Sequence, residues 1–110
     1  MRQWEIRLYP FEDELPHPAV ILSTDERCEN RDLRSVNALI CTTSRLTRAA
    51  GKHEILLDEA DGLDWLTAVR CDIIYMLSKQ GFGELRGRVS ASRRVAITRR
   101  LVESLRLPTH

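Results

Sequence analysis

The sequence predicts an α+β fold, in which a small, strongly bent antiparallel sheet of short strands is followed by one helix. Two observations support this prediction. Short apolar segments, most of them with alternating polar residues, are separated by charged or turn-forming residues, and a helical period of apolar residues follows near the C-terminus. We expect one domain over residues 1–110. The predicted strands cover residues 4–9, 17–23, 36–42, 53–58, 68–78 and 85–89.

The N-terminal half is predicted to alternate strands with polar loops. The first strand shows clear polar–apolar alternation and ends at Pro10. Segment 11–16 is a short acidic loop. Segment 24–35 is highly charged and has no apolar periodicity, so we expect a solvated loop there. The strand over 36–42 is almost continuously apolar, which predicts a central position in the sheet.

The C-terminal half is predicted to contain one uninterrupted strand, a hairpin turn and the helix. The strand over 68–78 leads into segment 79–83, whose two glycines suit positive-φ positions of a hairpin. Ser90 is a candidate N-cap for the helix, and Pro108 is expected to end it. One helical stripe consists of Ala91, Val95, Thr98, Val102 and Leu105, widened by Ile97 and Leu101.

Composition excludes several classes of protein. No apolar run approaches the roughly 20 residues of a membrane span, and the first residues lack the apolar region of a signal peptide, so we expect a cytoplasmic protein. The three cysteines, Cys28, Cys41 and Cys71, are widely spaced, which argues against a disulfide framework and against zinc. We expect no metal and no cofactor.

The net charge of +1 hides an asymmetry along the chain. Residues 1–69 carry a balance of −5, and residues 70–110 carry a balance of +6. The C-terminal part is therefore the expected face for a polyanion or an acidic partner. Self-complementarity between the two halves, or a solvated arginine face on the helix, would also account for this pattern.

An ion pair embedded in apolar residues is the most informative feature of the chain. On a strand, Arg70 and Asp72 point to the same side, while Cys71 points to the other. Charged groups in so apolar a run are expected to be paired. They form either a structural salt bridge at the solvent end of a strand or a site that joins a phosphate-binding arginine to an acid–base carboxylate.

Polar residues at two other strand ends are further candidates. Thr43 and Ser44, beside Arg45, are good donors to a phosphate, although such residues also make common turns and caps. His17 begins the second strand and could act as an acid or a base, or be an ordinary loop histidine. His53 is expected to be a surface residue of its strand.

Segment 69–72 resembles the Val-Arg-Cys-Asp strand of PemK/Kid-type toxins, in the MazF/PemK family of toxin–antitoxin ribonucleases. Residues 5–6 resemble the family's opening Gly-Glu-Ile-Trp strand, and residues 18–23 resemble its Arg-Pro-Ala-Val-Val-Leu-Ser strand. Thr43 and Ser44 fall where the family has a Thr-Ser or Thr-Gly pair, and the last helix is also similar. The resemblance implies an SH3-like antiparallel barrel of the CcdB/PemK type with a C-terminal helix.

The resemblance also implies a function. It implies a metal-free endoribonuclease that cleaves single-stranded mRNA through its 2′-OH, forms a homodimer, and is neutralised by an antitoxin with an acidic, disordered segment. Asp72 would be the base, Arg70 would stabilise the phosphate and act as the acid, and His17 could share the acid–base work. Residues implied to bind RNA are Thr43, Ser44, Arg45, Arg48 and Ala50, the last two in a loop similar to the family's Arg-Thr-Ala-Gly loop.

Two departures keep alternatives open. His17 stands where much of the family has an arginine, and an imidazole cannot replace a permanent, forked charge. The loop over 11–16 is short and acidic, which should repel phosphates. One alternative is therefore a degenerate homologue that binds RNA or an antitoxin without cleaving. A gyrase poison like CcdB is disfavoured because this chain lacks the Trp-Gly-Ile tail through which CcdB acts.

Overall fold

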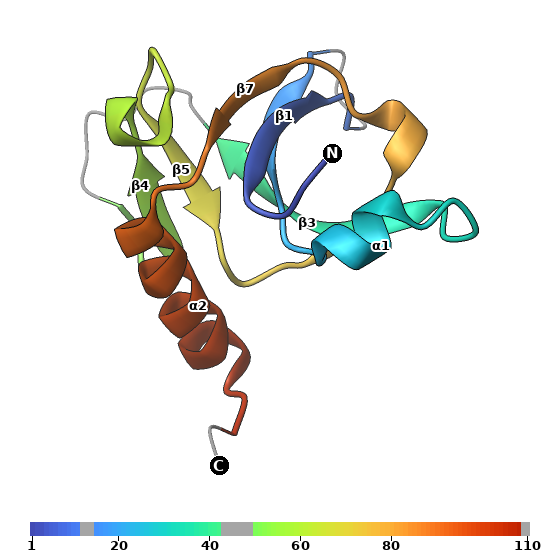
Figure 1. The fold of residues 1–110 in the computed structure, drawn as a ribbon. Helices are drawn as coiled ribbons and strands as arrows, with labels where there is room; N and C mark the ends of the chain where they lie inside the picture. The colour runs from blue at the N-terminus through green and yellow to red at the C-terminus, as the bar shows by residue number, and fades with distance from the viewer. Residues whose placement is uncertain (12–14, 43–49, 109–110) are drawn as a thin grey trace.

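The computed structural model describes residues 1–11, 15–42 and 50–108 (Figure 1). Within these ranges, seven strands and two α-helices, with two short 3-10 helices, form a curled antiparallel sheet with a helix at one end. The predicted α+β class and C-terminal helix are confirmed. The elements are β1 (Glu5–Tyr9), β2 (His17–Ile21), α1 (Asp25–Glu29), β3 (Ser35–Thr42), β4 (Glu54–Leu57), η1 (Glu59–Asp61), β5 (Thr67–Arg70), β6 (Tyr75–Ser78), η2 (Lys79–Gly81), β7 (Leu85–Arg88) and α2 (Ala91–Leu105).

Strand β3 organises the sheet, as its apolar sequence predicts. The strand order is β4-β5-β3-β2-β1-β7, and β6 pairs with β3 beside β5. At eight residues β3 is the longest strand, and it pairs with β2 on one edge and with both β5 and β6 on the other. The sheet curls into a half-barrel between β4 and β7, and α2 lies against its β4–β5 end (Figure 1).

Alternation along the strands creates a different apolar cluster on each face of the sheet. The main core joins Ile6, Val20, Leu39 and Val69, one from each of four strands, with Ile97 of α2. All five are fully buried. The opposite face carries a smaller cluster of Ala19, Ala38 and Leu77, packed against Tyr9, Phe11, Tyr75 and Phe82. The aromatic rings of this cluster therefore pack against one another rather than stand free.

Helix α2 turns a different face to the sheet from the one its apolar stripe suggests. Ile97 and Leu101 do pack on the core, but Val95, in the centre of the stripe, is 52% exposed. The guanidinium of Arg100 instead donates to the main-chain carbonyls of Lys52 and Glu54. Arginine stems can cover apolar surface while their heads satisfy polar groups, so arginines can occupy the packed face.

The start of α2 is capped by a neighbouring carboxylate. Ser90 is the N-cap residue, as predicted, but its side chain makes no capping bond. Its main-chain N–H donates to Oδ1 of buried Asp61 over 2.8 Å. Arg93 then donates to both Asp58 and Asp61, and so fastens the first turn of α2 to η1.

Two further predictions about local structure are wrong. Residues 25–29 form helix α1, because Thr24 caps it with its hydroxyl and acidic residues occupy its first turn. The helix buries no residue and so leaves no apolar period in the sequence. Segment 79–83 is not a hairpin turn, because η2 connects β6 to β7 and these strands lie in different parts of the sheet. Among the described glycines only Gly62, after η1, has positive φ.

A glycine in β7 allows close packing against η1. A methyl group on Gly87 would lie well inside van der Waals distance of the main-chain carbonyl oxygen of Asp61. We therefore expect Gly87→Ala to lower the free energy of unfolding by about 1–3 kcal/mol, as overpacking typically does. Gly83→Ala is the matched control, because its methyl group would meet Leu8 at ordinary contact distance. Urea unfolding of both variants tests this, and equal stabilities would contradict it.

None of the described helices is both long and apolar enough to cross a membrane.

Candidate functional site at the broken motif strand

The predicted strand over 68–78 is broken where its two charged residues lie. Val69 pairs with Cys41, and Tyr75 pairs with Ala38. These two pairs are three residues apart on β3 but six residues apart on the segment that runs from β5 to β6, so residues between the pairs must bulge out of the ladder. Strand β5 accordingly ends at Arg70, and pairing resumes only at β6. The prediction of one uninterrupted strand is therefore wrong at residues 71–74.

Arg70 and Asp72 form a two-point ion pair at this break. Nε of Arg70 donates to Oδ1 of Asp72 over 3.1 Å, and Nη2 donates to Oδ2 over 2.7 Å. The side chains remain 40% and 22% exposed, so a ligand can reach the pair from solvent. The predicted side-by-side arrangement of the two groups is confirmed.

The ion pair fixes the charge of both groups. The hydrogen bond from Arg70 holds the pKa of the Asp72 carboxyl below its ordinary value. The same hydrogen bond raises the pKa of the Arg70 guanidinium. Asp72 is therefore an anion, and Arg70 a cation, throughout the neutral pH range.

Cys71 anchors the break to the core and to β4. Its side chain is fully buried, on the opposite side from the ion pair, as the alternation predicts. Its main-chain N–H donates to the carbonyl oxygen of His53 over 2.8 Å. Burial raises the pKa of the Cys71 thiol to about 11, so this cysteine is a poor nucleophile.

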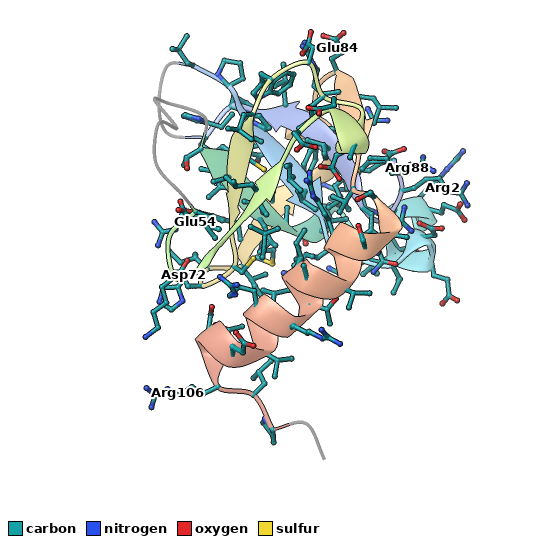
Figure 2. The ribbon with its side chains drawn as sticks, turned by 90° about the vertical axis from the view of Figure 1, so that its left-hand side faces the viewer. Arg2, Glu54, Asp72, Glu84, Arg88 and Arg106 are labelled. Atoms are coloured by element: carbon teal, nitrogen blue, oxygen red, sulfur yellow. The ribbon has the colours of Figure 1, made fainter. Side chains whose placement is uncertain are left out.

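A shallow pocket of about 410 Å³ opens beside Arg70. The described residues that line it are Thr42, Gly51, Lys52, His53, Glu54 and Arg70. Glu54 is opposite Arg70 in the β4–β5 ladder, and Figure 2 shows Glu54 and Asp72 on the same side of the molecule. A larger hollow of about 530 Å³, lined by residues 28–31, 33, 34 and 78–80, contains no residue of the predicted site. We therefore place the candidate site at the smaller pocket.

His17 lies on the same face of the sheet as Arg70 but not in this pocket. The registers place Ala19 opposite Ile40, and Thr42 opposite Ala68. Continuing these registers puts His17 on the same face as Arg70, two strands across and two residues along, which is about 12 Å away in an ideal sheet. The ring of His17 lies 6.1 Å from that of Phe11, between ring centres. His17 is not among the described residues that line the pocket.

Of the predicted RNA-binding residues, one lies in the described part of the chain. Ala50 is half-buried and precedes Gly51 of the pocket. Thr43, Ser44, Arg45 and Arg48 lie outside the described residues.

Sequence reasoning missed the contribution of β4 to the site. Lys52, His53 and Glu54 line the pocket because the β4–β5 ladder brings the start of β4 to the end of β5. The antiparallel order of two consecutive predicted strands was the signal that could have placed them there. Within residues 1–11, 15–42 and 50–108, no group of three His, Cys, Asp or Glu side chains could hold a metal ion.

Comparison with known proteins identifies the fold and the family. The sequence matches the family described as PemK-like, MazF-like toxin of type II toxin-antitoxin system over residues 2–105. The chain belongs to this family. The resemblance noted from the motif strand is thus confirmed, and the match covers nearly the whole toxin-like chain. A comparison with curated proteins found no match.

Solved structures show the same fold as this PemK/MazF-like chain. An endoribonuclease from a mycobacterial species, in complex with its cognate antitoxin, is 24% identical with a TM-score of 0.80, covering 100% of this chain and 99% of that one. A second mycobacterial endoribonuclease is 25% identical with a TM-score of 0.77, covering 100% and 95%. The MazE–MazF structure from Deinococcus radiodurans is 17% identical with a TM-score of 0.73, covering 96% and 94%.

The lowered pKa of Asp72 predicts a pH dependence of stability in this PemK/MazF-like chain. Because Arg70 depresses this pKa in the folded state, the stabilisation is fully present above the ordinary carboxyl pKa of about 3.9. It is lost as the pH falls through the depressed value. We expect wild-type protein to be more stable than Asp72→Asn at pH 7, and this gap in the free energy of unfolding to shrink as the pH falls below about 3.9. Urea unfolding across that range tests this, and a gap that is independent of pH would contradict it.

Proposed function

We propose that this chain is a metal-independent endoribonuclease that cleaves single-stranded mRNA within a toxin–antitoxin system. The observation that carries the proposal is the solvent-accessible Arg70–Asp72 ion pair, at the rim of a pocket, in a chain of the PemK/MazF-like toxin family. A guanidinium binds phosphate with two parallel hydrogen bonds, and a carboxylate beside it can accept a proton. We place the activity in the cytoplasm, where mRNA is found.

The proposed reaction uses the substrate's own 2′-hydroxyl. Asp72 takes the proton of the 2′-OH while O2′ attacks the phosphorus, and Arg70 stabilises the charge that develops on the phosphate oxygens. The P–O5′ bond then breaks, which leaves a 2′,3′-cyclic phosphate and a 5′-hydroxyl. Thr43 and Ser44 would hold phosphate or ribose oxygens, with Arg45, Arg48 and Ala50 along the RNA. Dependence on the 2′-OH would make the enzyme selective for RNA over DNA.

We propose two protein partners as well. The first is a second copy of the chain, because large apolar side chains remain exposed on α2, within the break at residues 71–74 and on β6, namely Val95, Ile73, Ile74 and Met76. The second is an antitoxin whose acidic segment covers the same pocket, since cationic side chains line it. Similar solved structures include an endoribonuclease with its cognate antitoxin, which supports this second proposal.

The test is cleavage of a long, mixed-sequence single-stranded RNA in EDTA. We expect discrete fragments that end in a cyclic phosphate, and no such fragments with Asp72→Asn. Glu84→Gln, at an exposed acidic residue in another part of the molecule, is the matched control and should cleave like wild-type protein (Figure 2).

Two observations favour a second candidate function, that of a catalytically degenerate binding protein. His17 replaces the family's arginine, and the loop over 11–16 is acidic. Wild-type protein that is folded and binds RNA or antitoxin, but leaves RNA intact in the same assay, would support this alternative and overturn the endoribonuclease.

A further inference from the structure

The proposed reaction needs an acid that the ion pair itself does not supply. The departing 5′ oxygen must receive a proton, because an alkoxide is a poor leaving group. Arg70 is a poor donor of that proton, because its hydrogen bond with Asp72 raises the guanidinium pKa further above its ordinary value. Asp72 is ionised and has no proton to give at neutral pH. A third group must therefore complete the site.

His53 is bound directly to the motif break. Its main-chain carbonyl accepts the N–H of Cys71, the residue between Arg70 and Asp72. It also lines the pocket with Arg70, and after Arg70 it contributes to the lowered pKa of the Asp72 carboxyl. Of the described residues that line this pocket, His53 is the one whose side-chain type titrates near neutral pH.

Among the described residues, helix α2 provides the hydrogen-bond partner of the His53 ring. Its Nδ1 lies 2.8 Å from Oγ of Ser104 on α2. In an imidazolium both ring nitrogens carry hydrogen, so Nδ1–H donates to the Ser104 hydroxyl and Nε2–H is left for a substrate. The contact with α2 thus orients the ring through Nδ1.

We propose that His53 is the general acid of this site and that Ser104 is the residue that positions it. The inference rests on the proposed endoribonuclease function. Asp72 takes the 2′-OH proton, the O2′–P bond forms and the P–O5′ bond breaks. The proton on Nε2 of His53 passes to the departing 5′ oxygen. Asp72 ends neutral and His53 ends as a neutral imidazole, and proton exchange with water restores both.

Charged side chains lie near His53 on its own segment, at the break and on α2. Lys52 and Glu54 flank it on its own strand, Arg70 and Asp72 lie at the break, and Arg100 of α2 donates to the carbonyls of Lys52 and Glu54. An anionic carboxylate and an imidazole therefore lie on neighbouring segments of the site, and such pairs of groups divide base and acid roles in enzymes.

The general acid proposed here is His53, whereas the family resemblance implied a share of the acid–base work for His17. His17 shares the sheet face of Arg70 but is not among the described pocket residues, and β3 lies between them. His53 is joined to the motif by a hydrogen bond. The two histidines therefore make matched variants for one experiment.

The test compares two RNA substrates that contain one mapped cleavage site. In the second substrate, sulfur replaces the 5′ oxygen of the scissile bond. A thiolate leaves readily without a proton, so the analogue bypasses the acid. We expect His53→Gln to slow cleavage of the oxygen substrate by about 10²-fold or more, and to cleave the sulfur analogue like wild-type protein. Asp72→Asn should be slow on both substrates.

The pH dependence of the cleavage rate and the Ser104→Ala variant test the inference independently of the sulfur analogue. On the oxygen substrate the wild-type rate should fall as the pH rises through the imidazole range, and His53→Gln should lose this dependence. Ser104→Ala should slow the oxygen substrate only. Rates for His53→Gln that are like wild-type on the oxygen substrate, or equally reduced on both substrates, would overturn the inference and leave the endoribonuclease standing. If His17→Gln, rather than His53→Gln, were slow on the oxygen substrate and restored to the wild-type rate by the sulfur analogue, the general acid would be His17. Wild-type protein that cleaves neither substrate would overturn both proposals.

Discussion

Arg70→Ala is expected to lower the rate of RNA cleavage by about 10²–10³-fold or more, because it removes a preorganised donor to the developing phosphate charge. The loss should appear in kcat and kcat/KM alike, since the interaction strengthens in the transition state. Arg70→Lys is the informative companion, because it keeps the charge but loses the two-point hydrogen bonding of the guanidinium. We expect its activity to lie between that of Arg70→Ala and the wild type.

The fold should survive this change. Asp72 is 22% exposed, so water can solvate its carboxylate when Arg70 is removed. Arg70→Ala should therefore lose no more stability than Asp72→Asn, because both variants remove the same exposed ion pair. Cooperative unfolding of Arg70→Ala, measured beside the cleavage rates, would assign the loss of cleavage to chemistry. Cleavage by Arg70→Ala at the wild-type rate would show that the reaction takes place elsewhere in the chain.

Arg93→Met is expected to have the largest effect on stability. Arg93 donates to both oxygens of Asp58 and to Oδ2 of Asp61, and the Asp61 side chain is fully buried. Removing one partner of a buried ion pair leaves an uncompensated charge and costs about 3–5 kcal/mol. This is a large part of the roughly 5–15 kcal/mol that stabilises a small domain.

Two comparisons isolate this effect. Arg99→Met, at an exposed arginine of the same helix, should change the free energy of unfolding by less than about 0.5 kcal/mol. Adding Asp61→Asn to Arg93→Met removes the buried charge and should recover part of the lost stability. Urea unfolding measures all three. Equal losses for Arg93→Met and Arg99→Met would contradict the account of how η1 and α2 are joined.

The part of the site that sequence could predict is the part that local geometry determines. Arg70 and Asp72 are two residues apart on a strand, so their common side follows from alternation alone. The central position of β3 follows from its continuous apolar run. The short apolar segments predict the positions of six strands in the same way. They do not separate β6 from β5, because the apolar residues run on from one strand to the other.

The remainder depends on contacts between distant segments. The break at residues 71–74 arises from a change of register against β3, which leaves no local signal. The packed face of α2 is set by arginines that find partners on η1 and β4, so the apolar stripe misleads. His53 enters the site only because β4 pairs with β5 and because Cys71 donates to its carbonyl oxygen.

The central claim is that this chain cleaves RNA by using the RNA's own 2′-hydroxyl at the Arg70–Asp72 site. The most direct measurement places a single 2′-deoxy nucleotide immediately 5′ of one mapped cleavage site, in an RNA with a second, unmodified site as internal control. The reaction is run in EDTA. The account predicts that cleavage stops at the modified site and continues at the unmodified one. Cleavage at both sites would contradict it, because the nucleophile would then not be the 2′-hydroxyl.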